Sequence, residues 1–534
     1  MYRPDFACAS KVELCRSRNV ISDSEDIFAA FIRLVSQLEA ASTGPKQARF
    51  GALQEALLAG RLVPASQMIS AAGRAGTVAA CTVLPNYGTT DGEKLANLRQ
   101  RISEAARTGL GTGIDVSDFD DPRRALCEIN AAAREVNREL VDARRRPPAL
   151  MVSCSAEHPL VSGFYTAKKD ANLMEWVANI SVMMPDDENL WHTHSRAIAQ
   201  CSHGNGEPGL LFPDIANDDN PTPQFELRST APCAEVFLAE NEKCVFFAIN
   251  LAAHVSERGV DWDLLRDTVN LAVLGADAAV DLAEQNTDSV VRQKRRIGIG
   301  VCGYHSALIL MEVPYASSAP LAWRISETIL FQSHQASAII AQVSDPFPAF
   351  ASSRWREDTW RQRKFSRLGQ FIPKSKWHEL SATIAKTGIR NASVTAFPPT
   401  GVSSDILGVS KSYEPYFSLL GRSGLASNRD LRVPPEVVNV LSMNEDQILA
   451  NLDELGQWKG ATADHILACA RQIPVDAHLA VHEAFSILSD ESAAKTVNLP
   501  NEATVDDTLA VFENARAKKL KGVTVFRDGS ITTL

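Results

Sequence analysis

Apolar residues recur at helical spacing in several stretches of the chain. In residues 27–38 and 262–283 they fall three and four positions apart, the spacing that lines one face of a helix. The same pattern predicts helices at residues 48–58, 95–106, 123–142 and 325–340. Gly60 fits a helix end, because glycine commonly follows the last helical turn. Residues 1–60 are therefore expected to be mainly helical.

Short, uninterrupted apolar runs alternate with these helices. Runs at residues 77–85, 150–153, 180–184 and 245–253 have the length of buried strands. A strand–helix–strand pattern follows from residue 497 onwards. Helices alternating with short apolar strands are typical of α/β proteins. We expect a helical region at residues 1–60 and an α/β domain at residues 61–534.

One stretch combines residues that carry chemistry. Cys233 and Glu235 lie two positions apart, so an extended backbone would point both side chains to one side. Pro232 favours that conformation for Ala231. Cys244 is the first residue of the next apolar run, which follows a polar, turn-prone segment. If the two segments pair as a hairpin or lie side by side, the sulfurs of Cys233 and Cys244 would come close together. The alternative is that these cysteines are core residues, as free cysteine often is.

Three further segments predict loops or turns. Residues 62–73 are expected to form a loop that enters the core, and the glycine-rich residues 109–113 a loop that lets backbone approach a ligand. Residues 392–397 predict a strand, followed by a Pro-Pro-Thr-Gly turn and a helix start. Small hydroxyl residues and glycine after a strand suit a phosphate-binding corner. A plain connection between strand and helix is the alternative.

Composition narrows the class of protein. The net charge of −10 argues against a general nucleic-acid binder, and 45% hydrophobic residues is ordinary for a globular protein. No apolar run is long enough for a transmembrane helix, and the N-terminus lacks signal-peptide features, so a cytoplasmic protein is expected. The ten cysteines are then expected to be reduced. No CxxC pair occurs, so no metal site is predicted.

Taken in order, these blocks resemble the catalytic chain of ribonucleotide reductase, specifically its class II, which depends on adenosylcobalamin. The first blocks are PASQMISAAG at residues 64–73, ACTVLP at 80–85 and GLGTG at 109–113. The central blocks are APCAE at residues 231–235, CVFFAINL at 244–251 and RRIGIGVCG at 295–303. The last are PPTGVSS at residues 398–404, YEP at 413–415 and KGVTVFRDGS at 521–530. The resemblance covers nearly everything after residue 60.

The resemblance implies a ten-stranded α/β barrel with a central finger loop, plus the helical N-terminal region. It implies that Cys233 carries a thiyl radical that removes the ribose 3′ hydrogen, and that Glu235 is the base at the 3′ hydroxyl. Cys81 and Cys244 would reduce the 2′ carbon and end as a disulfide. The implied substrate-binding residues are Ser66, Ala80, Ala231, Pro399, Thr400, Gly401, Val402, Ser403 and Ser404.

The resemblance also implies a cofactor and partners. Adenosylcobalamin is the implied radical source, because Phe526 stands where class I enzymes carry a relay tyrosine and it has no hydroxyl to lose a proton. An external thiol reductant is expected, because Cys302 and Cys469 are the last cysteines and neither lies in the final stretch. The implied substrate is a ribonucleoside di- or triphosphate. Neither nucleic acid nor membrane is expected as a partner, and the protein is expected to be a monomer or homodimer.

Ala231 departs from the family, which has an asparagine that hydrogen-bonds the ribose. This departure leaves two alternatives to an ordinary reductase. One is a diverged radical enzyme that modifies a nucleotide in a specialised nucleoside pathway. The other is a non-catalytic nucleotide-binding homologue. The presence of all four residues Cys81, Cys233, Glu235 and Cys244 argues against a non-catalytic homologue.

Overall fold

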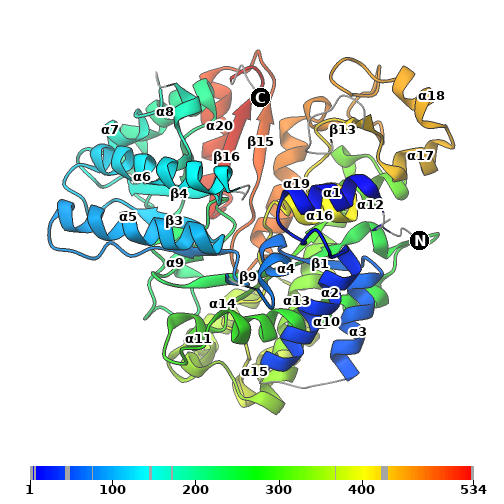
Figure 1. Cartoon of the computed structure of the whole chain (residues 1–534), viewed down its shortest axis with the longest axis horizontal. Coiled ribbons are helices and arrows are strands. Elements are labelled where there is room, and N and C mark those ends of the chain that lie inside the picture. The colour runs from blue at the N-terminus through cyan, green and yellow to red at the C-terminus, as the bar shows by residue number, and fades with distance from the viewer. Residues whose placement is uncertain are drawn as a thin grey trace.

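A computed structural model gives the fold of the chain (Figure 1). It describes residues 4, 6, 8–42, 48–74, 76–143, 147–169, 172–366, 368–422 and 431–530. Among these residues, no helix combines the length and apolar character needed to cross a membrane.

Five parallel strands form one half of a barrel. In pairing order they are β2 (Cys81–Val83), β3 (Gly111–Asp115), β4 (Leu150–Ser155), β5 (Ala178–Met183) and β6 (Gly209–Leu211). β3 and β4 are buried along almost their whole length, as expected for parallel strands covered on both faces. The helices on the outer side of this half are α5 (Asp91–Thr108), α6 (Pro122–Asp142) and α8 (Glu188–Asn205) (Figure 1).

The second half begins with β9 (Lys243–Asn250) and its parallel neighbour β12 (Ile297–Cys302). It ends with the parallel pair β15 (Thr496–Leu499) and β16 (Gly522–Arg527). Single bridges from Thr395 to Ile299 and from Phe397 to Ala493 place residues 395–397 between these pairs. β9 runs antiparallel to β2, and β16 antiparallel to β6, so the two halves close on each other. The ten-stranded α/β barrel implied by the resemblance is confirmed.

A short hairpin lies inside this barrel. Its strands are β7 (Ser229–Thr230) and β8 (Phe237–Leu238). The Ser229 hydroxyl is 2.8 Å from the Ser153 hydroxyl of β4, on one side of the barrel. From the other side, the Ser492 amide donates to the Glu235 carbonyl oxygen at 3.0 Å. The hairpin is therefore held by both halves of the barrel, as a central finger loop must be.

The N-terminal helices share one apolar core with the barrel. α2 (Ile27–Ala41) and α3 (Ala48–Leu58) pack against α10 (Trp262–Ala283). Buried Phe31, Leu34 and Leu38 of α2 belong to the same apolar cluster as the barrel strands. The helical character predicted for this region is confirmed, whereas the domain boundary at residue 60 stays a prediction.

The remaining elements surround this frame. The other strands are β1 (Leu62–Pro64), which pairs antiparallel with β9, and the pairs β10 (Val255–Ser256) with β11 (Gly259–Val260) and β13 (Gly421–Arg422) with β14 (Leu431–Arg432). The other α-helices are α1 (Ala9–Ser17), α4 (Ser66–Ala71), α7 (Val161–Tyr165), α9 (Pro213–Asp218), α11 (Val290–Lys294), α12 (Tyr304–Leu310), α13 (Ala319–Ser344), α14 (Asp358–Ser366), α15 (Lys374–Thr387), α16 (Gly401–Leu407), α17 (Pro435–Leu441), α18 (Glu445–Ala450), α19 (Val475–Ile487) and α20 (Val505–Ala517).

Two loop predictions are wrong. Residues 62–73 contain β1 and α4, because pairing with β9 supplies the backbone hydrogen bonds that a loop would lack. Residues 111–113 belong to β3 and do not form a loop, although Gly109 and Gly111 still line a large cavity of the barrel. Their glycines serve close packing: a Cβ on Gly113 would lie 2.0 Å from the Thr230 carbonyl oxygen of the finger hairpin.

Candidate functional site

A cavity of about 900 Å³ opens at one end of the barrel. It is bordered by the starts of β2 and β3 and by residues 398–403, which follow the last bridged segment of the second half. Its volume lies near the upper end of the range for small-molecule sites. Ten of the predicted site residues line it: Ser66, Ala80, Cys81, Cys233, Glu235, Pro399, Thr400, Gly401, Val402 and Ser403.

The tip of the finger hairpin presents Cys233 and Glu235 to this cavity. The expectation of an extended backbone here is wrong, because the Ala234 amide donates to the Ala231 carbonyl oxygen at 2.9 Å and forms a turn. Ala234 itself has a φ of 61°, in the left-handed region. The turn still brings both side chains to the cavity, with Cys233 exposed and Glu235 buried.

Glu235 is placed to exchange a proton with a ligand. Burial raises its pKa to about 7, although backbone hydrogen bonds oppose the shift. Its Oε2 atom is buried and has no hydrogen-bond partner within the described part of the chain. A carboxyl group with a pKa near neutrality suits general acid–base catalysis.

Cys81 and Cys244 lie directly opposite each other. They are cross-strand partners in the antiparallel pairing of β2 and β9. Residues so placed have Cα atoms about 4.5–5.5 Å apart, within the range of about 4.4–6.8 Å found for disulfides. Burial raises the pKa of both thiols well above the ordinary value, and the charge of Glu235 adds to the shift. Both sulfurs therefore stay protonated at neutral pH.

Cys244 and two other predicted residues do not line the cavity. Cys244 is fully buried behind Cys81. Ala231 is also fully buried, in the small apolar cluster that surrounds both cysteines. The hydroxyl of Ser404 lies 2.7 Å from that of Thr400, on the inner side of the turn. The resemblance implied substrate binding for Ala231 and Ser404 and redox chemistry for Cys244, but Ala231 and Ser404 contact the protein interior.

The predicted phosphate corner is formed by residues 398–403. Thr400 has a left-handed φ of 56°, and its hydroxyl accepts a hydrogen bond from the Ser412 amide at 2.8 Å. The Ser403 hydroxyl donates to the Pro64 carbonyl oxygen at 2.9 Å and so links this corner to β1. These contacts hold the turn in place beside Ser66, and a Cβ added to Gly401 would meet only open space.

A buried charge cluster lies beneath the finger hairpin. Glu242, at the start of the chain segment leading into β9, accepts from Lys294 Nζ at 2.8 Å and from Arg296 Nε at 2.7 Å. Although burial opposes it, the charges of Arg296 and Lys294 hold the pKa of Glu242 below its ordinary value. Arg296 also pairs with Glu491, the residue before Ser492. Through the Ser492 amide, this cluster reaches the backbone of Glu235.

Several further residues that the sequence did not predict also line the cavity. Arg18 to Ser22, between α1 and α2, line the cavity, as do Phe246 and Ala248 of β9. Pro147, Pro148 and Ala149 line it at the start of β4. No motif marks residues 18–22 or 147–149, because they reach the cavity only through contacts between distant parts of the chain, whereas Phe246 and Ala248 lie within the block at residues 244–251. A run of small residues before β4 was the one available signal.

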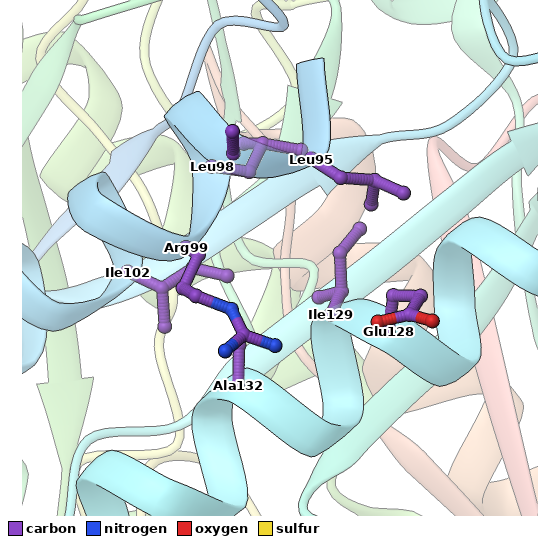
Figure 2. Close-up of a pocket in the computed structure, with 8 residues that line it drawn as sticks. Leu95, Leu98, Arg99, Ile102, Glu128, Ile129 and Ala132 are labelled. Atoms are coloured by element: carbon purple, nitrogen blue, oxygen red, sulfur yellow. The ribbon is translucent and has the colours of Figure 1, made fainter. Parts of the chain in front are cut away.

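A second, smaller pocket lies between α5 and α6 (Figure 2). It has a volume of about 120 Å³, and its lining combines aliphatic side chains such as Leu98, Ile102 and Ile129 with Arg99 and Glu128. None of the predicted site residues lines it. The larger cavity is therefore the candidate active site.

We expect Gly113→Ala to displace the finger hairpin. The added methyl group would overlap the Thr230 carbonyl oxygen, which lies only 2.0 Å from the built Cβ position. Overpacking of this kind typically costs about 1–3 kcal/mol of stability, and the shift would displace Cys233 within the cavity. Steady-state turnover should fall at least about tenfold, since small misplacements carry large rate penalties.

Gly204→Ala provides the matched control for this substitution. A Cβ there meets no atom within 4 Å, and the residue lies within α8. We expect unchanged turnover and a gain of up to about 1 kcal/mol in unfolding free energy. Equal turnover for Gly113→Ala and Gly204→Ala would contradict the role assigned to Gly113.

Comparison with known proteins agrees with this geometry. Residues 188–526 match the model of the family described as "Ribonucleotide reductase, barrel domain". A Mycobacterium tuberculosis protein named "Vitamin B12-dependent ribonucleoside-diphosphate reductase" is 30% identical over 85% of this chain and 68% of its own length. A protein of the same name from Thermoplasma acidophilum is 26% identical over 95% of this chain and 68% of its own length.

Similarity to another type of reductase is less extensive. The "Ribonucleoside-diphosphate reductase subunit alpha" of Chlamydia pneumoniae is 26% identical over 52% of this chain and 27% of its own length. The family match covers the finger hairpin, both β9 and β12, and the phosphate corner. The barrel, its internal hairpin and these similarities together show that this chain belongs to the ribonucleotide reductase family.

Proposed function

We propose that this protein is a class II ribonucleotide reductase, which replaces the 2′ hydroxyl of a ribonucleotide with hydrogen. The observation that carries the proposal is the opposition of Cys81 and Cys244 across β2 and β9, next to a hairpin tip that presents Cys233 and Glu235. The similarity to vitamin B12-dependent reductases over most of the chain supports it.

Each of the four residues has a distinct role in this proposal. The Cys233 sulfur, as a thiyl radical, takes the ribose 3′ hydrogen, while Glu235 accepts the proton of the 3′ hydroxyl. Cys81 and Cys244 together supply two electrons and two protons. The 2′ C–O bond breaks, the hydroxyl leaves as water, and a disulfide forms between the two sulfurs. The Cys233 thiol then returns the abstracted hydrogen to the 3′ carbon, which regenerates the thiyl radical, and Glu235 returns its proton to the 3′ oxygen as the product forms.

The barrel cavity fits the cofactor named for the relatives. Cys233 is exposed, so a radical can reach its sulfur from the open cavity. On the side of β3 and β4, the lining includes Thr108, Gly109, Gly111 and residues 147–149, whose small or compact side chains leave room for a large group beside Arg107. These residues would hold adenosylcobalamin, which supplies a carbon-centred radical when bound.

The structure is also consistent with a radical source at the site itself. Phe526 lies on β16, and a Cβ on Gly206 would lie 3.6 Å from its ring. Neither Val525 nor Phe526 lines the cavity. Phe526 has no hydroxyl proton to lose, so this position offers no tyrosine relay towards Cys233.

Product analysis tests the proposed function. The protein is incubated with adenosylcobalamin, dithiothreitol and each ribonucleoside 5′-diphosphate or 5′-triphosphate in turn. Mass spectrometry should show a 2′-deoxyribonucleotide that has lost one oxygen atom. A product that keeps the 2′ oxygen would favour a diverged radical enzyme, and the absence of any product with all substrates would reject the proposal.

We expect one disulfide to form in each turnover when no external thiol is present. The electrons come from Cys81 and Cys244, whose opposition allows the bond to form without backbone movement. Peptide mapping after a single turnover should find these two cysteines linked, while the buried Cys302 and Cys469 stay free. Product formation with Cys81 and Cys244 both still reduced would contradict the assignment. An external thiol would then restore the pair for the next turnover.

We expect the rate to rise with pH as Glu235 loses its proton. Only the carboxylate can accept the 3′ hydroxyl proton, so the rate should increase through a pKa of about 7 and then level off. Glu235→Gln should remove this ascending limb and lower the rate roughly 10²–10⁴-fold. Rates are measured at saturating substrate between pH 5.5 and 9, so that phosphate titration has little influence. An unchanged limb in Glu235→Gln would assign the proton transfer to another group.

A further inference from the structure

The connection between α1 and α2 forms part of the cavity wall. Arg18 and Ser22 lie at the two ends of the lining segment, which shares the cavity with residues 398–403 of the phosphate corner. Arg18 is half-buried and directly follows the last residue of α1. This N-terminal segment lies outside the motifs that point to the catalytic residues.

The packing of α1 places Arg18 near the phosphate corner. α1 contacts α16, the helix that begins at this corner, and the two lie side by side in Figure 1. Near the start of α1, Lys11 Nζ donates to the carbonyl oxygen of Leu407, the last residue of α16. Further along, Cys15 lies within the electrostatic influence of Asp405. The two helices therefore run in opposite directions, and Arg18 comes next to the start of α16.

Charge distinguishes Arg18 from the other lining residues. The phosphate corner itself, residues 398–403, contains no charged side chain. The cavity is lined by three arginines, of which Arg74 pairs with Glu25 and Arg107 pairs with Glu139 at 3.1 Å. For Arg18, no acidic partner is found among the residues that the structure describes. Arg18 is thus the lining cation whose charge is not already balanced by a carboxylate.

We propose that Arg18 binds the terminal phosphate of the substrate and gives the enzyme its preference for a nucleoside diphosphate or triphosphate over a monophosphate. A guanidinium group offers two parallel N–H donors to phosphate oxygens and keeps its charge at any working pH. The backbone amides of residues 401–403 would hold the inner phosphate. This inference rests on the proposed function and adds a specificity-determining residue to it.

Equilibrium binding tests this role without catalysis. Isothermal titration of the full chain with ADP, GDP, CDP and UDP identifies the ribonucleoside diphosphate that binds best, and the matching monophosphate serves as its comparison. For Arg18→Ala we expect diphosphate affinity to fall about tenfold or more, the size expected for a charged hydrogen-bonded contact. Monophosphate affinity should change by less than about twofold, and Arg18→Lys should give an intermediate loss of diphosphate affinity.

Arg16→Ala is the matched control. It removes the same charge two positions earlier, in the last turn of α1, but Arg16 does not line the cavity, so diphosphate affinity should stay as in the unaltered protein. In turnover assays, Arg18→Ala should raise KM for the diphosphate and leave kcat nearly unchanged. Circular dichroism establishes whether each variant is folded. If Arg18→Ala is not folded, the loss of diphosphate affinity is measured with Arg18→Lys instead.

The possible results separate this inference from the proposed function. Equal losses for diphosphate and monophosphate, or equal losses for Arg16→Ala and Arg18→Ala, would overturn the role of Arg18. Diphosphate binding that is unaffected by Arg18→Ala would overturn it too, while product formation would still support a reductase. If the unaltered protein binds none of the nucleotides and forms no product, the proposed function itself fails.

Discussion

Cys233→Ser should abolish turnover while leaving the fold intact. Serine keeps the shape of the side chain, but an alcohol O–H bond is much stronger than a thiol S–H bond. The oxygen atom therefore cannot carry the radical that the sulfur carries. Cys233 is exposed at the tip of a hairpin, so the substitution should change stability by less than about 0.5 kcal/mol. Deoxyribonucleotide formation should fall below detection in an assay with adenosylcobalamin and dithiothreitol.

Cys127 offers a matched control for this substitution. It is the other exposed cysteine, and it lies on α6 and does not line the cavity. Cys127→Ser should keep full turnover. Freeze-quenched electron paramagnetic resonance should show a radical signal in the unaltered protein and in Cys127→Ser, but not in Cys233→Ser. Turnover that survives in Cys233→Ser would move the radical to another residue.

The long helices of this fold follow from local sequence patterns. The predicted helix at residues 262–283 coincides with α10, and the one at residues 48–58 with α3. In α10 an apolar face packs on the barrel, and Asp261 caps the first turn by accepting from the Leu264 amide. The apolar periodicity and the N-terminal cap both depend on residues close together in the sequence, so they can be recognised from the sequence alone.

The finger hairpin shows where local patterns fail. The spacing of Cys233 and Glu235, together with Pro232, predicted an extended backbone, yet Ala234 adopts a left-handed conformation and the segment turns. That conformation is favourable only because both sides of the barrel hold the hairpin, through Ser229 and through the Ser492 amide. Likewise, the glycine of β3 that looked like a loop signal is required by a contact with Thr230. Tertiary contacts, not local preferences, decide both cases.

The opposition of Cys81 and Cys244 is a matter of strand register. Neither local periodicity nor spacing indicates that these two cysteines pair across β2 and β9; only the resemblance to the family implied it. The position of Arg18 at the cavity also depends on a contact between distant segments, because it requires α1 to pack against α16. Such contacts between distant segments carry no local signal, which is why family motifs identified the cysteines and nothing identified Arg18.

Glu242→Gln should strongly destabilise the protein. Glu242 is completely buried and is the carboxylate that both Lys294 and Arg296 contact. Its neutralisation leaves two buried cations, of which Arg296 keeps its contact to Glu491. Breaking a buried ion pair in this way typically costs about 3–5 kcal/mol of stability. Chemical denaturation should show this loss in the free energy of unfolding.

Glu139→Gln is the control, because it makes the same chemical change in an exposed pair. Arg107 and Glu139 are more than half exposed, so their pairing should contribute at most about 1 kcal/mol. The buried cluster should also affect activity, because Glu491 precedes Ser492, whose amide holds the Glu235 carbonyl oxygen. Glu242→Gln should therefore lower turnover under conditions where the variant is still folded. A loss of stability as small as that of Glu139→Gln would show that Lys294 and Arg296 do not depend on Glu242 for compensation of their charge.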